Sequence, residues 1–439
     1  MGFTLPVILI AIVLMVIAAT VYKVHPFISL LLAALGTGVA TGIPLADILI
    51  AIQTGFGDLM SYIGLIVVLG SILGVALEQS GAALRLADGV LALAGQKRPI
   101  LAMSIIGTVI GIPVFCDSGF IILSGLKNAV AKKSEATRGA LALALASGLY
   151  TAHTLIPPTP GPIAAAGNLG AADHIGLIML LGFFITIPTV AVAYGWAKLR
   201  GENIATTLPD LEPTTDSEHP ALWRAIIPIG IPILLIALAS VARLLPLENK
   251  PISVLYFIGQ PVIALLIGVG LAFALFPKKK QIDWVESGIK LAGPILIITG
   301  AGGALGGILK ATSLADDIKT LLNNSADSGL IILLLAFVIA ALLKTMQGSS
   351  TSALVITSSI LAPLLPALGF DSGIELALAV LAIGAGAMTV SHANDSYFWV
   401  VSQFSGISMR DAYRNYTTMT GLQGDAAILT VLLLYGLFG

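Results

Sequence analysis

The sequence has few charged side chains. Only 10% of its 439 residues are Asp, Glu, Lys or Arg, whereas soluble domains have about 25%. These charged residues are too few to cover the water-exposed surface of a soluble protein of this length. The composition therefore indicates that lipid is the solvent. The net charge of -1 excludes the basic surface that a nucleic-acid partner requires. The chain has a single cysteine, Cys116, which excludes an intrachain disulfide. It also has no metal-ligand spacing such as HExxH, so we expect neither a metal nor another cofactor.

Apolar runs of about 20 residues recur along the chain, the length that crosses a bilayer as a helix. We therefore predict an all-α polytopic membrane protein. The first run, residues 3–20, has no basic region before it and no small-residue cleavage site, so we interpret it as a retained helix. Residues 198–224 have the composition of a linker, and their cations predict a cytoplasmic position. We predict that this linker separates two repeats, 1–197 and 225–439.

A shift of about 233 residues brings features of the two halves into register, as in an internal repeat. Five matches follow in order along the chain: Pro26 with Pro261, Gly55 with Gly288, Gly70 with Gly300, Ser118 with Ser349, and His153 with His392. Over the last two matches the offset drifts from 231 (118 to 349) to 239 (153 to 392) as loops lengthen. Five matches in one order favour a real repeat over chance.

Most cations gather in six segments, which predicts that these segments face the cytoplasm. They contain 17 of the 22 Lys and Arg residues: Lys23; Arg85, Lys97 and Arg98; Lys127, Lys132, Lys133 and Arg138; Lys198, Arg200 and Arg224; Lys278, Lys279, Lys280 and Lys290; Arg410 and Arg414. This asymmetry places both chain termini on the outer side of the membrane.

One apolar segment in each half does not fit a simple crossing. Residues 99–126 have cations at both ends and polar or helix-breaking residues inside, and their length does not suffice for two spans of about 20 residues. We predict a re-entrant hairpin that enters from the cytoplasm and turns back midway. Its counterpart, residues 328–365, is interrupted between Lys344 and Ser352 and has acidic flanks, so it should enter from outside. Each half then has five crossings and one hairpin, and an odd count inverts the second repeat.

A long segment that is broken at its centre follows each hairpin. The first break, HTLIPPTPGP from His153 to Pro162, contains four prolines that disallow a continuous helix. The second, SHANDSYFW from Ser391 to Trp399, puts polar side chains at bilayer depth. Such breaks are costly in lipid unless they line a cavity, so two tips and two breaks predict a polar site near the midplane, as in secondary transporters. Half-helix N-termini at this site suit an anionic substrate.

The candidate substrate ligands lie at these tips and breaks: Ser118, Gly119, His153, Thr159, Gly348, Ser349, Ser350, Thr351, His392 and Asn394. Asp117 and Asp395 are the candidates for proton coupling, because a carboxylate in the bilayer costs about 2.5–3.5 kcal/mol and burial favours its protonated form. For both acids and both histidines, a hydrogen-bonded structural role is the alternative. Lys344 is a candidate to attract a substrate carboxylate, and pairing with an acid is equally consistent with its position.

The stretches LIPPTPGP (Leu155 to Pro162) and SHANDSYFW, with the Gly348-Ser349 turn, resemble the signatures of the gluconate permease family of proton symporters. The resemblance covers essentially the whole chain. It implies uptake of gluconate or a related sugar acid with a proton across a bacterial inner membrane. The family's anion transporter superfamily implies a homodimer and an elevator mechanism. Asp117 and Thr159 stand where the family tends to carry glutamate and histidine, so a shorter or differently substituted hydroxy acid is an alternative substrate.

Two other functions fit parts of the sequence. Gly55-Phe56-Gly57-Asp58 matches the GxGD pattern of intramembrane aspartyl proteases. Such an enzyme needs a second aspartate on a preceding helix, and Asp47, the only acid upstream, falls in a predicted loop, so we do not expect an enzyme. A sodium-coupled carboxylate transporter or a cation/proton antiporter is the closer alternative, because hydroxyl and carbonyl groups at the hairpin tips also coordinate Na⁺.

Overall fold

The protein is helical in the part that the structure describes. This computed structural model describes residues 4–22, 24–94, 98–207, 220–243, 250–277, 280–313, 328–393 and 395–438. Within these ranges the regular structure consists of helices, and Thr206 and Ile407 form an isolated β-bridge. Six helices among the described residues are long and apolar enough to cross a membrane, or eight if two bent pairs each count as one span. The chain is therefore an all-α, multi-pass membrane protein, as predicted.

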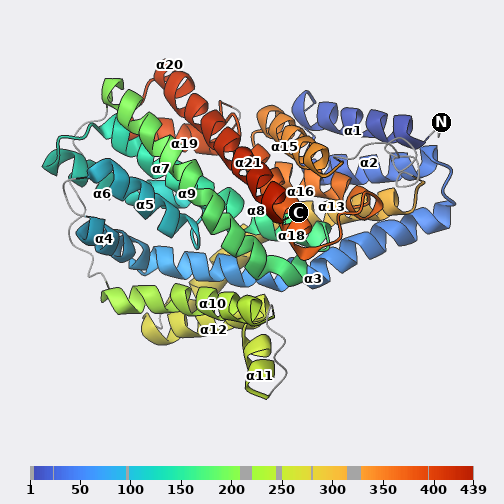
Figure 1. Ribbon diagram of the computed structural model, residues 1–439, viewed down its shortest axis with the longest axis horizontal. Coiled ribbons are helices and arrows are strands. Elements are labelled where there is room, and N and C mark those ends of the chain that lie inside the picture. The colour runs from blue at the N-terminus through green and yellow to red at the C-terminus, as the bar shows by residue number, and fades with distance from the viewer. Residues whose placement is uncertain are drawn as a thin grey trace.

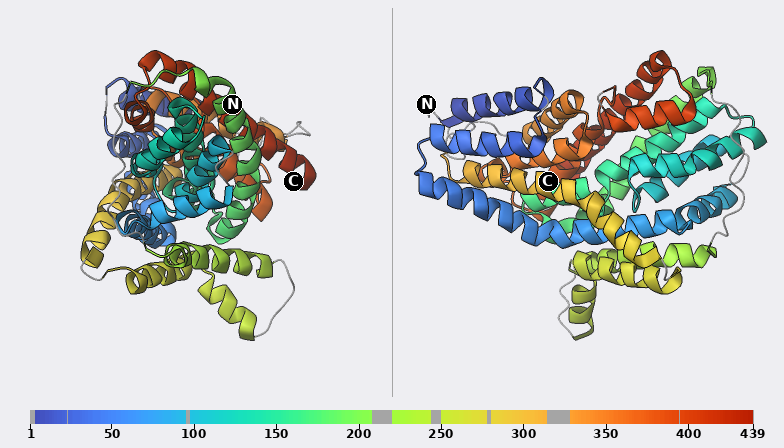
Figure 2. Two further views of the ribbon diagram at one scale, coloured as in Figure 1. Left: turned by 90° about the vertical axis from the view of Figure 1, so that its left-hand side faces the viewer. Right: turned by 180° about the vertical axis from the view of Figure 1, so that it is seen from behind.

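The described residues of the first half form nine α-helices, whose arrangement Figures 1 and 2 show. They are α1 (Thr4–Thr20), α2 (Pro26–Ala40), α3 (Leu45–Gln79), α4 (Ala82–Ala94), α5 (Pro99–Gly111), α6 (Cys116–Lys133), α7 (Arg138–Leu155), α8 (Pro160–Asn168) and α9 (Ile175–Arg200). Prolines begin α2, α5 and α8, because the first N–H of a helix has no intrahelical partner and its loss costs nothing.

The second half repeats the order with longer connections. Its α-helices are α10 (Leu222–Arg243), α11 (Lys250–Ile258), α12 (Pro261–Leu275), α13 (Gln281–Lys310), α15 (Ser328–Gln347), α16 (Ser350–Leu361), α17 (Leu364–Ala367), α18 (Gly373–Met388), α19 (Ser396–Ser405), α20 (Met409–Asp411) and α21 (Thr418–Phe438). The bend between α11 and α12 is 70°.

Both predicted hairpins are present. We call the pair α5 and α6 hairpin 1, and the pair α15 and α16 hairpin 2. Hairpin 2 turns at Gly348, whose φ of 80° is a conformation that glycine adopts without steric cost. The next residue, Ser349, caps α16 by accepting a hydrogen bond from the Ser352 amide (3.2 Å). Each tip is therefore a short turn between two helices, as expected for a segment that enters and leaves on one side.

Both predicted breaks are also present, and the first is shorter than the motif suggested. Helix α7 continues through His153 to Leu155, and α8 begins at Pro160, so the break covers residues 156–159. Prolines 157 and 158 there cannot donate backbone hydrogen bonds. The second break covers residues 389–395 and ends at Asp395, which caps α19 by accepting from the Tyr397 amide (3.1 Å).

Helix packing follows the internal repeat. In the first half α5 packs on α7 and α7 on α9, while in the second α15 packs on α18 and α18 on α21. Between the halves, α2 packs on α13 and α12 packs on α3, so each half supports the long helix of the other. These matching pairs describe two inverted repeats.

The two long helices, α3 and α13, cross in close contact. A Cβ atom added at Gly55 of α3 would collide with the carbonyl group of Gly303 in α13, and one at Gly307 would meet the Ala51 carbonyl. The glycines at positions 303 and 307 of α13, spaced as in a GxxxG pattern, therefore allow close packing against α3.

The structure differs from prediction at three places. The segment that begins with Arg85 is predicted only as a charged cytoplasmic connection, but residues 82–94 form α4, which is too short to cross a bilayer and buries Ala83, Leu86 and Ala87. Lys127 was assigned to a charged cytoplasmic segment, but it lies within α6 and is fully buried. The predicted linker 198–224 starts inside α9, and Lys23, Lys97, Lys278, Lys279 and residues 208–219 lie outside the described residues. The repeat boundaries stay a prediction.

Candidate functional site

A cavity of about 300 Å³ lies where both hairpin tips meet the second helix break. We call it the central cavity, and its lining comes from four segments: Phe115, Cys116 and Asp117 of hairpin 1; Tyr150 and His153 of α7; Gln347, Gly348, Ser349, Ser350 and Thr351 of hairpin 2; and Asp395, Ser396 and Tyr397 at the start of α19. The first turns of α6, α16 and α19 thus border the cavity. Their free N–H groups carry partial positive charge, which favours an anion.

Seven of the residues predicted for the site line this cavity: Asp117, His153, Gly348, Ser349, Ser350, Thr351 and Asp395. They come from segments that are far apart in the sequence, and the fold of the two repeats brings them together. Lys344 lies directly behind the tip of hairpin 2, fully buried.

Four predicted ligands lie outside the lining. Gly119 packs against the Leu149 side chain. The Thr159 hydroxyl donates to the Ile156 carbonyl (2.6 Å), and the His392 Nε2 atom lies 2.9 Å from the Thr345 carbonyl oxygen. The fourth, Ser118, is partly buried beside the cavity, and Asn394 lies outside the described residues. A role for these residues in binding substrate stays a prediction.

Lys344 and Asp395 form a buried ion pair. The Lys344 ammonium lies 2.5 Å from an Asp395 carboxylate oxygen and also donates to the Gly348 carbonyl (2.8 Å). Asp395 accepts further hydrogen bonds from the Ser391 hydroxyl and the Tyr397 amide. The pairing of Lys344 with an acid, which the sequence left open, is therefore present, and a role in attracting a substrate carboxylate stays a prediction. The pair ties the tip of hairpin 2 to the second break, and the two charges cancel.

Asp117 differs from Asp395, because no cation pairs with it in the part of the chain that the structure describes. Its carboxylate receives a weak hydrogen bond from the Cys116 thiol (3.5 Å), and the Ser396 side chain lies beside it. Among the described residues, no Lys, Arg or His lies within ion-pair distance of Asp117. The central cavity therefore has one carboxylate whose charge is not balanced by a side chain.

Several lining residues are not among those predicted from the sequence, and Gln347 is the clearest example. Among the described residues, neither of the buried side-chain amide atoms of Gln347 has a hydrogen-bond partner, and the same holds for the buried Nδ1 atom of His153. Buried polar groups are nearly always satisfied, so these atoms at the cavity wall are available to a ligand. Tyr150 donates to or accepts from the Ser350 hydroxyl (2.8 Å). Its spacing of three residues from His153 places both on one helix face, a signal that the sequence did contain.

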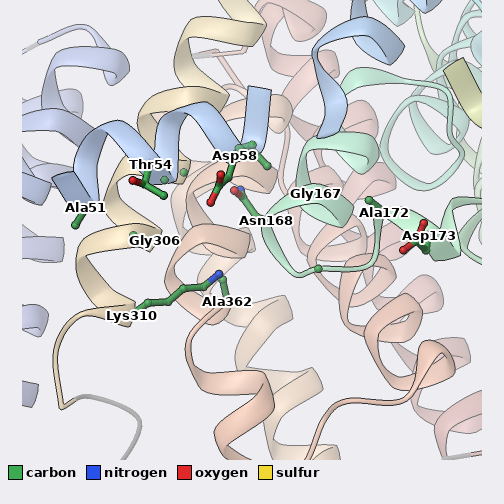
Figure 3. A pocket seen from close by; sticks show the side chains of 15 residues that line it. Ala51, Thr54, Asp58, Gly167, Asn168, Ala172, Asp173, Gly306, Lys310 and Ala362 are labelled. Carbon is green, nitrogen blue, oxygen red and sulfur yellow. The ribbon is translucent and has the colours of Figure 1, made fainter. Parts of the chain in front are cut away.

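A second cavity of about 480 Å³ lies elsewhere, among α3, α13 and the end of α8 (Figure 3). Figure 3 shows the side chains of Asp58 and Asn168 pointing toward each other, while Lys310 extends toward Ala362. Asp58, Asp173 and Lys310 are exposed, and no predicted site residue lines this cavity. Among the described residues no group of three His, Cys, Asp or Glu could hold a metal ion. We therefore take the central cavity as the candidate site.

Comparisons with known proteins agree with this architecture. A family described as "GntP family permease" matches residues 3–437. The gluconate permease of Pseudomonas aeruginosa is 30% identical, and the match covers 97% of this chain and 96% of the relative. The D-serine transporter DsdX of Escherichia coli K12 is also 30% identical, over 97% of both chains. The structure resembles that of the Alcanivorax borkumensis YdaH transporter, with a TM-score of 0.70, 15% identity and coverage of 94% and 99%, which shows a shared fold.

Proposed function

Because this chain belongs to the GntP family of permeases, and is thus a membrane transporter, we propose that it imports gluconate or a related sugar acid or hydroxy acid together with a proton. The observation that carries the proposal is the charge balance of the central cavity. Lys344 and Asp395 neutralise each other, which leaves Asp117 as an uncompensated carboxylate. A second negative charge on the substrate would face repulsion in this buried site. A proton on Asp117 removes the repulsion and lets the carboxyl group donate a hydrogen bond.

The polar groups of the cavity suit a hydroxylated anion. The amide of Gln347, the Nδ1 atom of His153 and the hydroxyl groups of hairpin 2 supply donors and acceptors for substrate hydroxyls. The helix N-termini supply donors for a carboxylate. Thr159, which distinguishes this chain from gluconate-specific signatures, lies in an adjoining small cavity with His153. Shorter hydroxy acids therefore belong among the test substrates.

Coupling to a proton also fits the energetics of anion uptake. A membrane potential of 100 mV opposes entry of one negative charge by about 2.3 kcal/mol. One proton makes the transfer electroneutral, so a pH gradient drives it. This assigns the coupling role to Asp117 and a structural role to Asp395, whose oxygen atoms already accept three hydrogen bonds.

We place the protein in a bacterial inner membrane with both termini on the outer side. Helix α4, which contains Arg85, and the end of α6, which contains Lys132 and Lys133, lie toward the same end of the molecule, away from the N-terminus (Figure 1). The test is labelling of introduced cysteines with a membrane-impermeant reagent, for which the buried Cys116 gives a low background. A Lys133→Cys variant should react only from the cytoplasmic side. Reaction from outside would reverse the orientation.

We also propose a homodimer in which the hairpins and broken helices move as a unit against α3 and α13. Small residues of α3 support this motion: Gly70 and Gly74 face backbone carbonyls of Pro158 and Pro113 at the break and the tip. A disulfide between cysteines introduced at Ser71 and Val114, which line one small cavity, should block uptake until it is reduced. Uptake that continues with the disulfide formed would contradict the motion, and native mass spectrometry tests the dimer.

An amino acid is a second candidate substrate, supported by Asp117. A zwitterion carries its own ammonium group, which could neutralise the free carboxylate without a proton. The relative named a D-serine transporter gives this candidate further weight. A sodium ion at Asp117 is a further alternative, either as the coupled ion of a carboxylate transporter or in a cation/proton antiporter.

Uptake into proteoliposomes distinguishes these functions. Labelled gluconate, shorter hydroxy acids and D-serine are supplied under a proton gradient or a sodium gradient, each imposed alone. We expect accumulation of a sugar acid or hydroxy acid that depends on ΔpH and not on Na⁺. Accumulation that requires Na⁺ would replace the proton by sodium, and accumulation of D-serine alone would change the substrate class. Transport of no organic solute under either gradient would favour the antiporter.

A further inference from the structure

Lys127 is a second fully buried lysine, and the proposed function gives it no role. Its ammonium donates to the Phe404 carbonyl (2.9 Å) and to the Ser405 hydroxyl (2.8 Å), and it lies 5.1 Å from the centre of the Phe120 ring. Among the described residues, none of its contacts is a carboxylate, and the charged group that acts on it, Arg138, is also a cation. A buried cation without an acid needs another source of negative charge.

The C-terminus of α19 is that source. This helix ends at Ser405, and Gly406 follows in the left-handed conformation. The last carbonyl groups of a helix have no intrahelical donor and carry partial negative charge, so an ammonium group there satisfies both partners. Lys127 therefore caps the C-terminus of α19, although Lys127 and Ser405 are 278 residues apart in the sequence.

Helix α19 is consequently held at both ends by a lysine from a different hairpin. At its N-terminus the capping residue Asp395 pairs with Lys344 of hairpin 2. At its C-terminus Lys127 of hairpin 1 binds Phe404 and Ser405. The helix has ten residues, or about 15 Å between its ends.

The contacts between α6 and α19 follow one order along both helices. Ser396 lies beside Asp117 at the central cavity, and the Tyr397 ring meets the Phe120 ring edge-on at 6.1 Å. Lys127 meets Ser405 at the far ends. The two helices therefore run side by side in the same direction, and Lys127 closes the end that is remote from the cavity.

We propose that Lys127 is a positioning residue that fixes α6 to α19, so that Asp117 and Asp395 stay at a constant separation on one rigid unit. The inference rests on the proposed function, because that function assigns proton coupling to Asp117 and a structural role in the same cavity to Asp395. Lys127 itself does not line the cavity and has no contact with substrate.

The variants for the test are Lys127→Met, which removes the donor, and Lys127→Arg, which keeps a cation. Lys133→Met is the matched control, since Lys133 is an exposed lysine of the same helix. A fourth variant, Lys127→Ser with Ser405→Asn, replaces the ammonium by the hydroxyl and amide chemistry that joins Asn168 to Ser358 elsewhere in the fold. It also serves if Lys127→Met does not fold.

Two measurements are made on each purified full-length variant. Pulsed EPR between spin labels at Ile121→Cys and Phe404→Cys, both partly exposed side chains, reports the separation of α6 and α19 without any substrate. Proteoliposome uptake of gluconate, or of the acid found to be transported, reports KM and maximal rate. We expect Lys127→Met to broaden the distance distribution and to lower the maximal rate at least about tenfold, the effect of one lost charge-assisted hydrogen bond. Lys127→Arg, the Ser/Asn pair and the control should keep a narrow distribution and most of the rate.

A Lys127→Met variant with a narrow distribution overturns the proposal, whatever its rate. A broad distribution with an unchanged rate also overturns it, because the positioning would then not matter for coupling. If the unmodified protein transports no organic acid, the proposed function fails. The EPR distances of Lys127→Met and of the Ser/Asn pair then still decide whether Lys127 fixes α6 to α19.

Discussion

Two helix pairs of the same design carry different chemistry. In each, the second arm of a hairpin packs beside the second part of the opposite half's broken helix: α6 with α19, and α16 with α8. The α6–α19 pair begins at Asp117 and Asp395 and ends at Lys127. The α8–α16 pair is joined by the Asn168 amide, which donates to the Val355 carbonyl (3.1 Å) and to the hydroxyls of Ser358 and Ser359.

The repeat relates the two joining contacts. A shift of 231 residues, which matches Ser118 with Ser349, takes Lys127 to Ser358. A shift of 237, within the drift of the repeat, takes Asn168 to Ser405. Both contacts thus link equivalent positions, but one uses an ammonium and the other an amide. Among these four helices and their caps, the charged side chains belong to the α6–α19 pair and none belongs to the α8–α16 pair. This is the division expected if one pair couples the ion and the other recognises substrate.

The largest expected effect comes from breaking the ion pair between Lys344 and Asp395, the residue that caps α19. Lys344→Met leaves the Asp395 carboxylate buried without a cation, which typically costs about 3–5 kcal/mol. We expect a steep loss of folded protein in detergent, measured by thermal unfolding and size-exclusion chromatography. Lys310→Met, at an exposed lysine, is the control. Adding Asp395→Asn to Lys344→Met should recover much of the stability, and a stable single variant would show that the pair is dispensable.

The second prediction distinguishes the roles of Asp117 and Asp395, the two acids of the α6–α19 pair. Asp117→Asn should remove accumulation driven by pH and leave a folded protein. With an imposed difference of about one pH unit the loss is about tenfold, because one unit is worth about 1.36 kcal/mol per proton. The unmodified protein should transport faster as the outer pH falls, since the external proton must bind first, whereas the variant should be insensitive. Asp58→Asn, in the other cavity, is the control. If pH still drives uptake by Asp117→Asn, the coupling role is wrong.

The third prediction concerns recognition at the tip of hairpin 2, next to the neutral pair. Gln347→Leu removes the two unsatisfied amide atoms from the cavity wall. We expect KM for the best substrate to rise about tenfold, with little change in maximal rate or pH dependence. Met346→Leu, at an exposed neighbour, should leave KM unchanged. An equal rise for both variants would mean that hairpin 2 tolerates no substitution and that Gln347 has no special role.

The smallest effect is expected at the contact of the neutral pair. Asn168→Leu removes the donor to α16, and neutral hydrogen bonds contribute about 0.5–1.5 kcal/mol each. Thermal unfolding should show a modest loss of stability, while the dependence of uptake on outer pH should stay as it was. Thr54→Val, on the wall of the same cavity, is the control. A changed pH dependence in Asn168→Leu would erase the functional difference between the two pairs.

Much of this architecture could be predicted from the sequence, because lipid penalises polar and irregular backbone. The hairpins and breaks stand out as interruptions of apolar runs, and Asp117, Lys344 and Asp395 stand out as charges within them. The inverted repeats followed from the order of these interruptions. Polar residues within apolar runs are therefore informative, because a polar group in the bilayer is retained only where it has a partner or a function.

Other features depended on contacts that no local pattern records. Lys127 belongs to a run with Lys132 and Lys133, so its sequence context indicated a charged surface, and only the fold places Ser405 beside it. His392 lies in the second break as predicted, but the path of the unwound backbone turns its ring toward Thr345 instead of the cavity. The sequence does not predict helix α4 as a crossing, because its 13 residues are too few to span a bilayer. It buries Ala83, Leu86 and Ala87 on one face, and this contact depends on the fold.

The three helix N-termini at the central cavity have a consequence for how such a protein changes over generations. Their positive character belongs to the backbone, so no substitution of a lining side chain abolishes it. Under the proposed function, the lining residues that distinguish one acid from another can then be exchanged one at a time while the attraction for a carboxylate persists. The preference for a particular acid would change through side chains, and the attraction for its carboxylate would stay with the backbone.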